Sequence, residues 1–268
     1  MKVVLFCGGL GTRIREYSEA IPKPMIPIGQ QPILWHLMDT YSRHGHRDFV
    51  LCLGYKANTI KDYFLNYRQQ AYVDCVVSNS GTNVEYLGKV QDDWRVAMID
   101  TGVWRNIGER LWAVRHHVRG EEYFMANYSD GLSDVNYNDM IAQFKASGKV
   151  AAFLAVRPPL TYHMADIGDD GRVRGMTSSE RAEIWINGGF FVFKSTIFDY
   201  MREGEELVVE PFARLIAEDQ LMAFKHQGFW RSMDTLRDRQ VLEDMVEQGR
   251  MPWRGADDSL ALRPLKAS

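Results

Sequence analysis

Short apolar runs alternate with longer amphipathic segments along most of this chain. A short apolar run bounded by turn residues is typical of a buried strand, whereas apolar positions spaced three and four apart are typical of a helix packed on a core. The first pattern predicts strands at 3–7, 49–53, 75–77, 95–99, 123–128 and 150–156. The second predicts helices at 32–44, 59–66, 109–118, 137–146 and 236–248. This alternation indicates an α/β fold with a mostly parallel, twisted sheet between two layers of helices.

The pattern changes near residue 157, where Arg157-Pro158-Pro159 interrupts the alternation. The segments 166–176 and 185–193 that follow favour antiparallel strands. We therefore expect one domain over 1–253, made of a first part (1–156) and a smaller β-rich lobe (157–253). Residues 254–268 are expected to form a C-terminal tail.

Composition narrows the class of protein without naming an activity. The chain has 268 residues, 46% of them hydrophobic and 25% charged, with a formal net charge of −3, so nothing favours a nucleic-acid partner. The three cysteines are too few for a disulfide framework, and Cys7 and Cys52 lie in apolar runs typical of buried thiols. No signal peptide or membrane-spanning run is present, so we expect a cytoplasmic protein that does not enter a membrane.

A glycine-rich segment, Gly8-Gly9-Leu10-Gly11-Thr12-Arg13, follows the first predicted strand. Glycines let the backbone turn sharply and bring amide N–H groups close to an anion, and Arg13 adds donors suited to phosphate. Its spacing excludes both the dinucleotide-binding Gly-x-Gly-x-x-Gly motif and the P-loop. Taken alone, the segment is also compatible with an ordinary turn that carries a surface arginine.

A lysine between two prolines, Pro22-Lys23-Pro24, follows ten residues after Arg13. Prolines disfavour helix and stiffen an extended segment, so Lys23 is a candidate to sit over the same phosphates. The alternative is a solvated lysine in a proline-rich loop.

Two aspartates, Asp130 and Asp234, each follow an apolar strand-like run. Carboxylates at the ligand-binding edge of an α/β sheet suit Mg²⁺ carried by nucleotide phosphates. A turn aspartate and a helix N-cap remain the alternatives for the two positions. The histidines lack zinc-site spacing, and no Gly-x-Ser-x-Gly elbow is present, so zinc chemistry and serine nucleophilic catalysis are not indicated.

Taken together and in order, these motifs resemble the sugar-phosphate nucleotidyltransferase family, and most closely its glucose-1-phosphate cytidylyltransferase branch. Further matching segments are 32–36, 54–56, 99–102, 186–191 and 233–238, so the resemblance runs from residue 1 to about 253. It implies a three-layer, Rossmann-like nucleotidyltransferase fold with a nucleotide-binding part (1–156) and an acceptor-binding, metal-completing part (157–253). It also implies a homo-oligomer.

The resemblance assigns roles to individual positions. The nucleotide-binding residues would be Gly8, Gly9, Gly11, Thr12, Arg13, Lys23, Thr101 and Arg110, with Arg13 and Lys23 acting in catalysis. Asp130 and Asp234 would bind Mg²⁺, and Asn187 would contact the acceptor. Two positions depart from the family: Glu109 and Ser129 stand where it has glycines. The reaction implied is attack of an acceptor phosphate on the α-phosphate of CTP, with release of pyrophosphate.

The acceptor side departs further, because the family's Glu-Lys-Pro before Ile-Asn-Gly-Gly is missing from 176–185 and the segment 161–165 is changed. Arg157 or Arg181 would then supply the missing positive charge, and Tyr162 and His163 would line the altered site. We therefore expect a CTP-dependent cytidylyltransferase whose phosphorylated acceptor is not glucose 1-phosphate. The alternatives are retention of glucose 1-phosphate, use of UTP or dTTP, and an inactive nucleotide-binding regulator.

Overall fold

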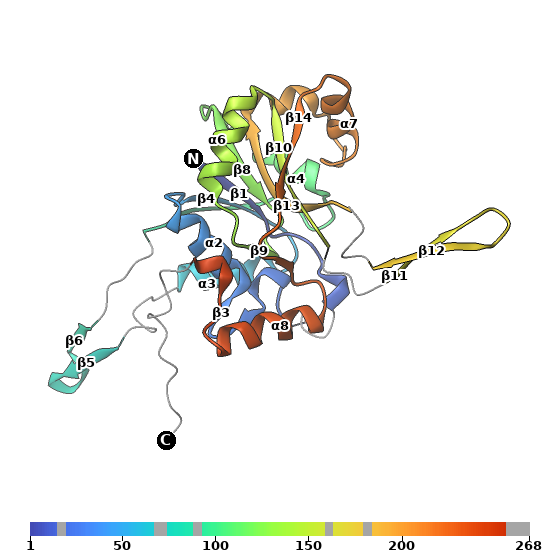
Figure 1. The fold of residues 1–268 in the computed structure, drawn as a ribbon. Helices are drawn as coiled ribbons and strands as arrows, with labels where there is room; N and C mark the ends of the chain where they lie inside the picture. The colour runs from blue at the N-terminus through green and yellow to red at the C-terminus, as the bar shows by residue number, and fades with distance from the viewer. Residues whose placement is uncertain (15–19, 67–73, 88–92, 159–162, 179–183, 256–268) are drawn as a thin grey trace.

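The structure is a computed structural model that describes residues 1–14, 20–66, 74–87, 93–158, 163–178 and 184–255. Its centre is a seven-stranded sheet in the order β14-β10-β13-β8-β1-β4-β7 (Figure 1). The strands are β1 (Lys2–Phe6), β4 (Asp48–Leu53), β7 (Arg95–Asp100), β8 (Tyr123–Asn127), β10 (Ala151–Val156), β13 (Ile186–Lys194) and β14 (Leu221–His226). All neighbours pair in parallel except β13, which is antiparallel to both β10 and β8. The mostly parallel α/β sheet is confirmed.

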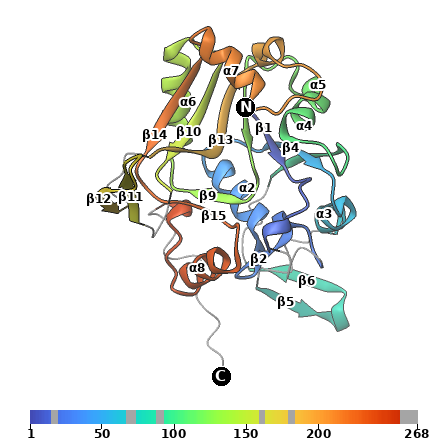
Figure 2. The ribbon, with the colours of Figure 1, turned by 90° about the vertical axis from the view of Figure 1, so that its right-hand side faces the viewer.

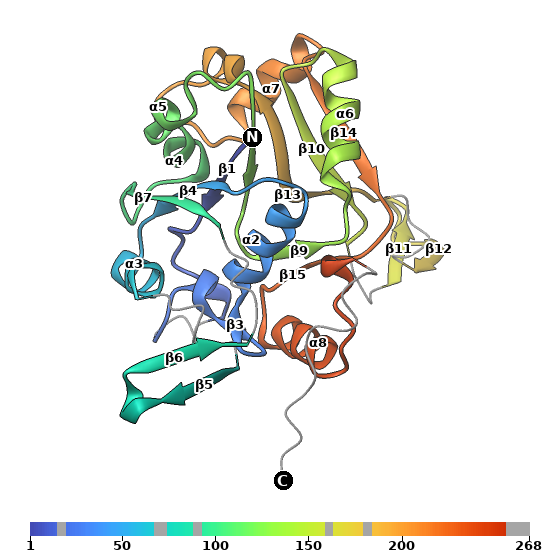
Figure 3. The same cartoon turned by 90° about the vertical axis from the view of Figure 1, so that its left-hand side faces the viewer.

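Successive residues of the central strands point into two separate cores, which explains their continuous apolar runs. On β1, Val3 and Leu5 join one core while Val4 and Phe6 join the other, and all four are buried. The first core is covered by α2 (Ile33–Arg43), α3 (Ala57–Leu65), α6 (Tyr137–Ser147) and α8 (Leu236–Glu247). The second is covered by α4 (Ile107–Ala113), α5 (Arg115–Val118) and α7 (Glu210–Ala217). The three-layer arrangement follows from this division (Figures 2 and 3).

Short elements link the layers on the side of the sheet where its parallel strands end. They are η1 (Thr12–Ile14), η2 (Lys23–Met25), β2 (Pro27–Ile28), β3 (Gln31–Pro32), β9 (Gly131–Ser133), β15 (Trp230–Ser232) and η6 (Pro252–Arg254). The 3-10 helix η5 (Ser195–Tyr200) follows β13 at the opposite edge, where the Ser195 N–H donates to the Glu122 carbonyl just before β8. β9 follows β8, β15 precedes α8, and the two pair antiparallel. Figure 2 shows α8 beside this β9–β15 ladder. The ladder therefore joins segments that lie about a hundred residues apart in the chain.

The expected β-rich lobe needs a correction. The segment 185–193 forms β13, which lies inside the central sheet between β10 and β8. Its side chains Phe190 to Phe193 are buried in the two cores, so the strand completes the main sheet rather than a second one. Only β11 (His163–Ile167) and β12 (Val173–Ser178) stand apart, as a two-stranded hairpin.

Other predicted elements shifted in smaller ways. The helix expected over 109–118 is two short helices, α4 and α5, separated at Val114. The strand expected at 75–77 is β5 (Cys75–Ser78), which pairs with β6 (Asn83–Tyr86) outside the central sheet, with η4 (Asn79–Gly81) between them. Strand β14 and helix α7 had not been predicted, because the apolar pattern in each segment is short and the segments are only partly buried.

Two hairpins, β5–β6 and β11–β12, project from the body of the molecule (Figure 1). Both expose apolar side chains, among them Val77 and Val84 on the first and Ile167 and Val173 on the second. An isolated two-stranded hairpin is marginally stable in water, so these faces leave apolar surface uncovered in a single chain. The expected homo-oligomer would cover such surface and stays a prediction. No helix in the described ranges is long and apolar enough to cross a membrane.

Candidate active site

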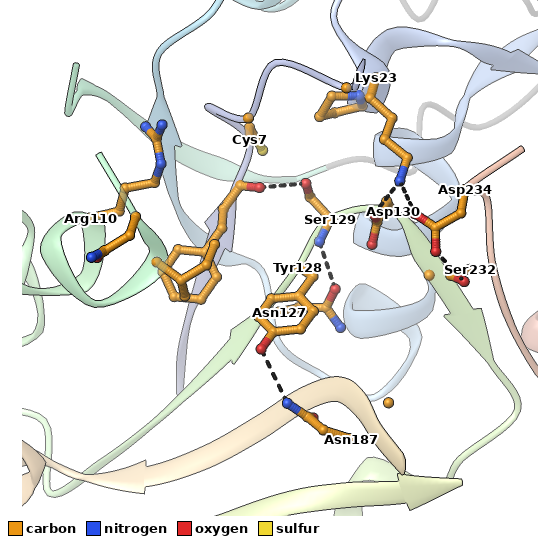
Figure 4. A pocket seen from close by; sticks show the side chains of 18 of the residues that line it. Cys7, Lys23, Arg110, Asn127, Tyr128, Ser129, Asp130, Asn187, Ser232 and Asp234 are labelled. Atoms are coloured by element: carbon orange, nitrogen blue, oxygen red, sulfur yellow. Dashed lines mark hydrogen bonds and ion pairs between the residues drawn. The ribbon is translucent and has the colours of Figure 1, made fainter. Parts of the chain in front are cut away.

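A cavity of about 570 Å³ opens where β1 and β8 end, at the edge of the sheet that binds ligands in open α/β folds. Gly9, Gly11 and Thr12 of the glycine-rich segment line it on one side. Lys23, Asp130 and Asp234 lie on another side, and the start of β13 with Asn187 closes the opposite wall (Figure 4). Most of the residues predicted from motifs therefore meet around one space.

Lys23 lies between the two predicted metal-binding aspartates. Its Nζ is 2.6 Å from Asp130 Oδ2 and 2.8 Å from Asp234 Oδ1. The backbone N–H of Met233 donates to the Asp130 carbonyl at 2.8 Å, and the Ser232 hydroxyl donates to Asp234 Oδ2 at 3.0 Å. The pairing of β9 with β15 thus positions both carboxylates against the Lys23 ammonium group.

Burial by itself would lower the pKa of Lys23, but Asp130 and Asp234 more than offset this effect and the pKa is raised. The ammonium group therefore remains charged, and it occupies the point where both carboxylates meet. Two carboxylates that converge on a cation suit Mg²⁺, which commonly takes one or two protein carboxylates together with phosphate and water oxygens. Among the described residues no group of three or more His, Cys, Asp or Glu side chains gathers. The remaining Mg²⁺ ligands would then come from substrate phosphates and water.

The glycine-rich segment turns tightly beside this cluster. Gly11 has φ +63°, a conformation that glycine adopts without strain, and its carbonyl accepts from the Ile14 N–H at 3.0 Å. Gly8 is buried and does not line the cavity, but its carbonyl accepts the Tyr55 N–H at 3.1 Å. The side chain of Arg13 lies outside the described part of the structure, so its expected role in catalysis stays a prediction.

Arg110 is buried beneath the glycine-rich segment, with 2% of its surface exposed. Its Nη2 donates to the Gly8 carbonyl at 3.0 Å, and its Nη1 donates to the Gly102 carbonyl at 2.8 Å. Further donations reach the carbonyls of Leu53 at 3.2 Å and Val103 at 3.1 Å. One guanidinium group therefore ties together the segments that follow β1, β4 and β7.

Thr101 completes this network instead of facing the cavity. Its hydroxyl donates to the Leu53 carbonyl at 2.7 Å and accepts from Arg110 Nη1 at 2.8 Å. The network also requires two glycines, since a Cβ at Gly8 would lie 2.0 Å from Arg110 Nη1 and one at Gly54 would lie 2.8 Å from it. Arg110 reaches the cavity wall, and both of its Nη groups donate to protein oxygens, so it supports the glycine-rich segment; its predicted role in nucleotide binding stays a prediction.

The two departures from the family's glycines have local explanations. Ser129 has φ +65°, in the left-handed region that favours glycine, and its hydroxyl donates to the Phe6 carbonyl at 2.7 Å. Glu109 forms a capping box at the start of α4 with Asn106, whose Oδ1 accepts the Glu109 N–H at 2.8 Å. At each position the side chain forms a hydrogen bond that a glycine could not form: Ser129 with the Phe6 carbonyl, and Glu109 with the Asn106 N–H.

The wall opposite Lys23 is built on Tyr128 and Asn187. The Asn187 side chain donates from Nδ2 to the Tyr128 hydroxyl at 3.1 Å and accepts the Gly189 N–H at 2.9 Å. Burial raises the pKa of Tyr128 to about 12, so its hydroxyl is protonated at neutral pH. Figure 4 shows this pair below the Ser129–Asp130 turn, which leads to Lys23.

Two further expected acceptor residues, Arg157 and His163, do not line the cavity. Arg157 is exposed, and its guanidinium lies 5.4 Å from the centre of the Trp185 ring. His163 is exposed on the β11–β12 hairpin, which projects away from the sheet (Figure 1). Tyr162 and Arg181 fall outside the described residues. Of the five expected acceptor residues, only Asn187 is therefore seen to line the cavity.

Several lining residues had escaped the sequence analysis, among them Arg105, Asn106, Glu206 and Ser232. Asn106 carries a readable signal, because Asn followed three residues later by Glu is a helix-start pattern. Glu206 carries none, since it lies in an irregular segment before α7.

Comparisons with known proteins show the family. A family model described as nucleotidyl transferase matches residues 2–238. The chain belongs to this family. Glucose-1-phosphate cytidylyltransferase from Salmonella typhi is 40% identical over 256 residues, covering 95% of this chain and 99% of the relative. A probable glucose-1-phosphate cytidylyltransferase from Bacillus subtilis is 32% identical over 256 residues, covering 95% of this chain and 99% of the relative.

The solved structure of HddC from Yersinia pseudotuberculosis shares the fold of this nucleotidyl transferase. Its TM-score is 0.65 at 19% identity, with 91% of this chain and 99% of that chain covered. The protein is therefore a nucleotidyltransferase with the α/β fold of its family, as its motifs had predicted.

Proposed function

We propose that this nucleotidyltransferase is a cytidylyltransferase that joins CTP to a hexose 1-phosphate, with glucose 1-phosphate as the acceptor, and releases pyrophosphate. The observation that carries the proposal is the convergence of Lys23, Asp130 and Asp234 beside a glycine-rich segment in one cavity. The base and the acceptor rest on the similarity to glucose-1-phosphate cytidylyltransferases over nearly the whole chain.

This acceptor differs from the one expected in the sequence analysis. The altered segments that suggested another acceptor lie partly outside the described residues, and Arg157 and His163 do not line the cavity. The similarity to the relatives gives no support to an acceptor other than glucose 1-phosphate. Glucose 1-phosphate is therefore the first acceptor to test.

The reaction needs no nucleophile from the protein. A phosphate oxygen of the acceptor forms a bond to the α-phosphorus of CTP, the bond from that phosphorus to the β-phosphate oxygen breaks, and pyrophosphate leaves with the electron pair. Backbone N–H groups around Gly9 and Gly11, which line the cavity, are suited to hold the triphosphate. The protein contributes alignment and positive charge instead of covalent chemistry.

Lys23 lines the cavity and is placed to stabilise the negative charge that develops on the leaving pyrophosphate. Asp130 and Asp234 are the residues that would hold Mg²⁺. When bound, Mg²⁺ neutralises phosphate charge and helps to orient the triphosphate. The Ser232 hydroxyl, which donates to Asp234, fixes the direction of that carboxylate.

A pyrophosphate-release screen tests the proposal. Purified protein with Mg²⁺ would be given CTP, UTP, dTTP or GTP against glucose 1-phosphate, other sugar 1-phosphates, polyol phosphates and amino-acid phosphates. We expect CTP with glucose 1-phosphate to give the highest kcat/KM, with CDP-glucose identified by mass. A higher kcat/KM for another nucleotide or acceptor would overturn that part of the proposal, and no pyrophosphate from any pair would point to an inactive binding protein.

A further inference from the structure

Glu206 is a carboxylate on the cavity wall that neither the metal-binding pair nor the glycine-rich segment explains. It is half-buried and lines the cavity together with Arg105 and Asn106. Among the described residues, no lysine or arginine forms an ion pair with it. Its Oε1 accepts the Leu207 N–H at 3.0 Å, and a carboxylate without a cation keeps further acceptor capacity for a ligand that donates hydrogen bonds.

The segment around Glu206 is held firmly in place. The Asn106 side chain donates to the Gly204 carbonyl at 3.2 Å, and Arg214 pairs with the Glu205 carboxylate. Leu207 is fully buried, and its N–H donates to Glu206 Oε1 at 3.0 Å. This segment packs directly on α4, because a Cβ at Gly108 would lie 2.1 Å from the Glu205 carbonyl. The Glu206 carboxylate is therefore presented to the cavity by a rigid wall.

Glu206 lines the same cavity as Tyr128 and Asn187. Burial is the main cause of the raised pKa of Tyr128, and the negative charge of the Glu206 carboxylate raises it further. Burial likewise raises the pKa of Glu206 itself, while the N–H groups of Ile107 and Leu207 favour its charged form. The wall thus combines one amide, one phenol and one carboxylate, a set that suits neutral hydroxyl groups.

We propose that Glu206 binds hydroxyl groups of the phosphorylated acceptor and selects against acceptors that carry a second negative charge. The inference rests on the proposed function and names a specificity residue within it. A carboxylate accepts hydrogen bonds from hydroxyls through the oxygen lone pairs that protein donors leave available. The same charge repels a carboxylate or second phosphate on the far end of an acceptor, since both would be poorly solvated there.

The test compares E206Q with wild type in steady-state kinetics. Glutamine keeps an oxygen for the Leu207 N–H but removes the charge, so the fold should be retained, and thermal unfolding would verify this. We expect kcat/KM for glucose 1-phosphate to fall about tenfold, as for loss of a hydrogen bond to a charged group, with KM for CTP changed less than about twofold. The preference for glucose 1-phosphate over glucuronic acid 1-phosphate should fall about tenfold as well.

The control is E203Q, three residues earlier on the same segment and exposed, for which all these constants should match wild type. An E206Q variant that folds normally but keeps the wild-type preference between the two acceptors would overturn the inference. A rise in KM for CTP alone would also overturn it, since Glu206 would then serve the nucleotide. Absence of turnover by wild type with every sugar phosphate would instead refute the proposed function, so the two failures are distinguishable.

Discussion

Lys23 Nζ lies 2.6 Å from Asp130 Oδ2, although 107 residues separate the two in the chain. The same ammonium group contacts Asp234, so it occupies the place where a metal ion between the carboxylates would carry its charge. A metal ion bound by these two carboxylates would therefore compete with Lys23 until phosphates provide the lysine with another partner.

Replacing this lysine should separate metal binding from catalysis. Lys23→Ala should lower kcat about 100-fold to 1000-fold, the scale for losing a group that stabilises transition-state charge. The same variant, without nucleotide, should bind Mn²⁺ several-fold more tightly, because the competing cation is gone. Electron paramagnetic resonance of free Mn²⁺ measures this directly. Lys145→Ala, on the exposed face of α6, serves as the control, and an unchanged Mn²⁺ affinity in Lys23→Ala would contradict the competition.

Arg110 should matter mainly for stability. Arg110→Lys cannot satisfy the carbonyls of Gly8, Leu53, Gly102 and Val103 together, and buried polar groups left without partners are costly. We expect a loss of about 3 kcal/mol in the free energy of unfolding, measured by urea denaturation. Arg119→Lys, at an exposed position, should lose less than about 0.5 kcal/mol. A loss below about 1 kcal/mol in Arg110→Lys would show that the network contributes little.

Ser129 has a left-handed backbone conformation and a hydroxyl that donates a hydrogen bond to the Phe6 carbonyl. Ser129→Ala loses the hydrogen bond to Phe6 but keeps the left-handed conformation, so we expect a destabilisation of about 1–2 kcal/mol. Ser129→Gly loses the same bond but relieves about 1 kcal/mol of backbone strain, so it should be the more stable of the two variants. Urea denaturation of both variants checks this order, and an alanine variant as stable as the glycine variant would argue against strain at this residue.

Buried His36 should make stability depend on pH. Burial lowers its pKa to about 4, while its Nε2 lies 2.9 Å from the Ile28 carbonyl, so the ring is neutral in the folded state. The unfolded chain binds a proton near pH 6.5, its ordinary value, so stability is full above that pH and is lost as pH falls toward about 4. Between about pH 7 and about pH 5 the loss from this residue should be about 2 kcal/mol.

His36→Gln should remove that share of the pH dependence in urea denaturation at the two pH values. His46, whose pKa burial also lowers to about 4, would still contribute. His163→Gln, at an exposed position on β11, is the matched control and should keep the wild-type pH profile. An equal loss of stability on acidification in His36→Gln and wild type would exclude His36 as a source.

The local pattern of apolar residues determined the position of several strands in this protein. The apolar runs at 3–7 and 49–53 predicted buried strands because a strand covered on both faces needs apolar residues throughout, and β1 and β4 occupy these positions. The order of Gly8–Arg13, Lys23, Asp130 and Asp234 was enough to predict a phosphate and metal site. The glycine-rich segment and Asp130 follow β1 and β8, and the ends of parallel strands share one edge of the sheet, so their proximity follows from the sequence pattern. Lys23 in η2 and Asp234 after β15 reach the same edge only through the fold.

Tertiary structure decided what depends on contacts between distant segments. Arg110 was predicted to bind nucleotide, and the fold adds that its guanidinium donates to the carbonyl of Gly8, 102 residues earlier in the chain. Glu206 had no motif, and only the packing of its segment against Gly108 brings it to the cavity. The pairing of β13 between β10 and β8 likewise came from the fold. Apolar periodicity reports which side of an element is buried but not which partner buries it, so these relationships appear only when the chain is folded.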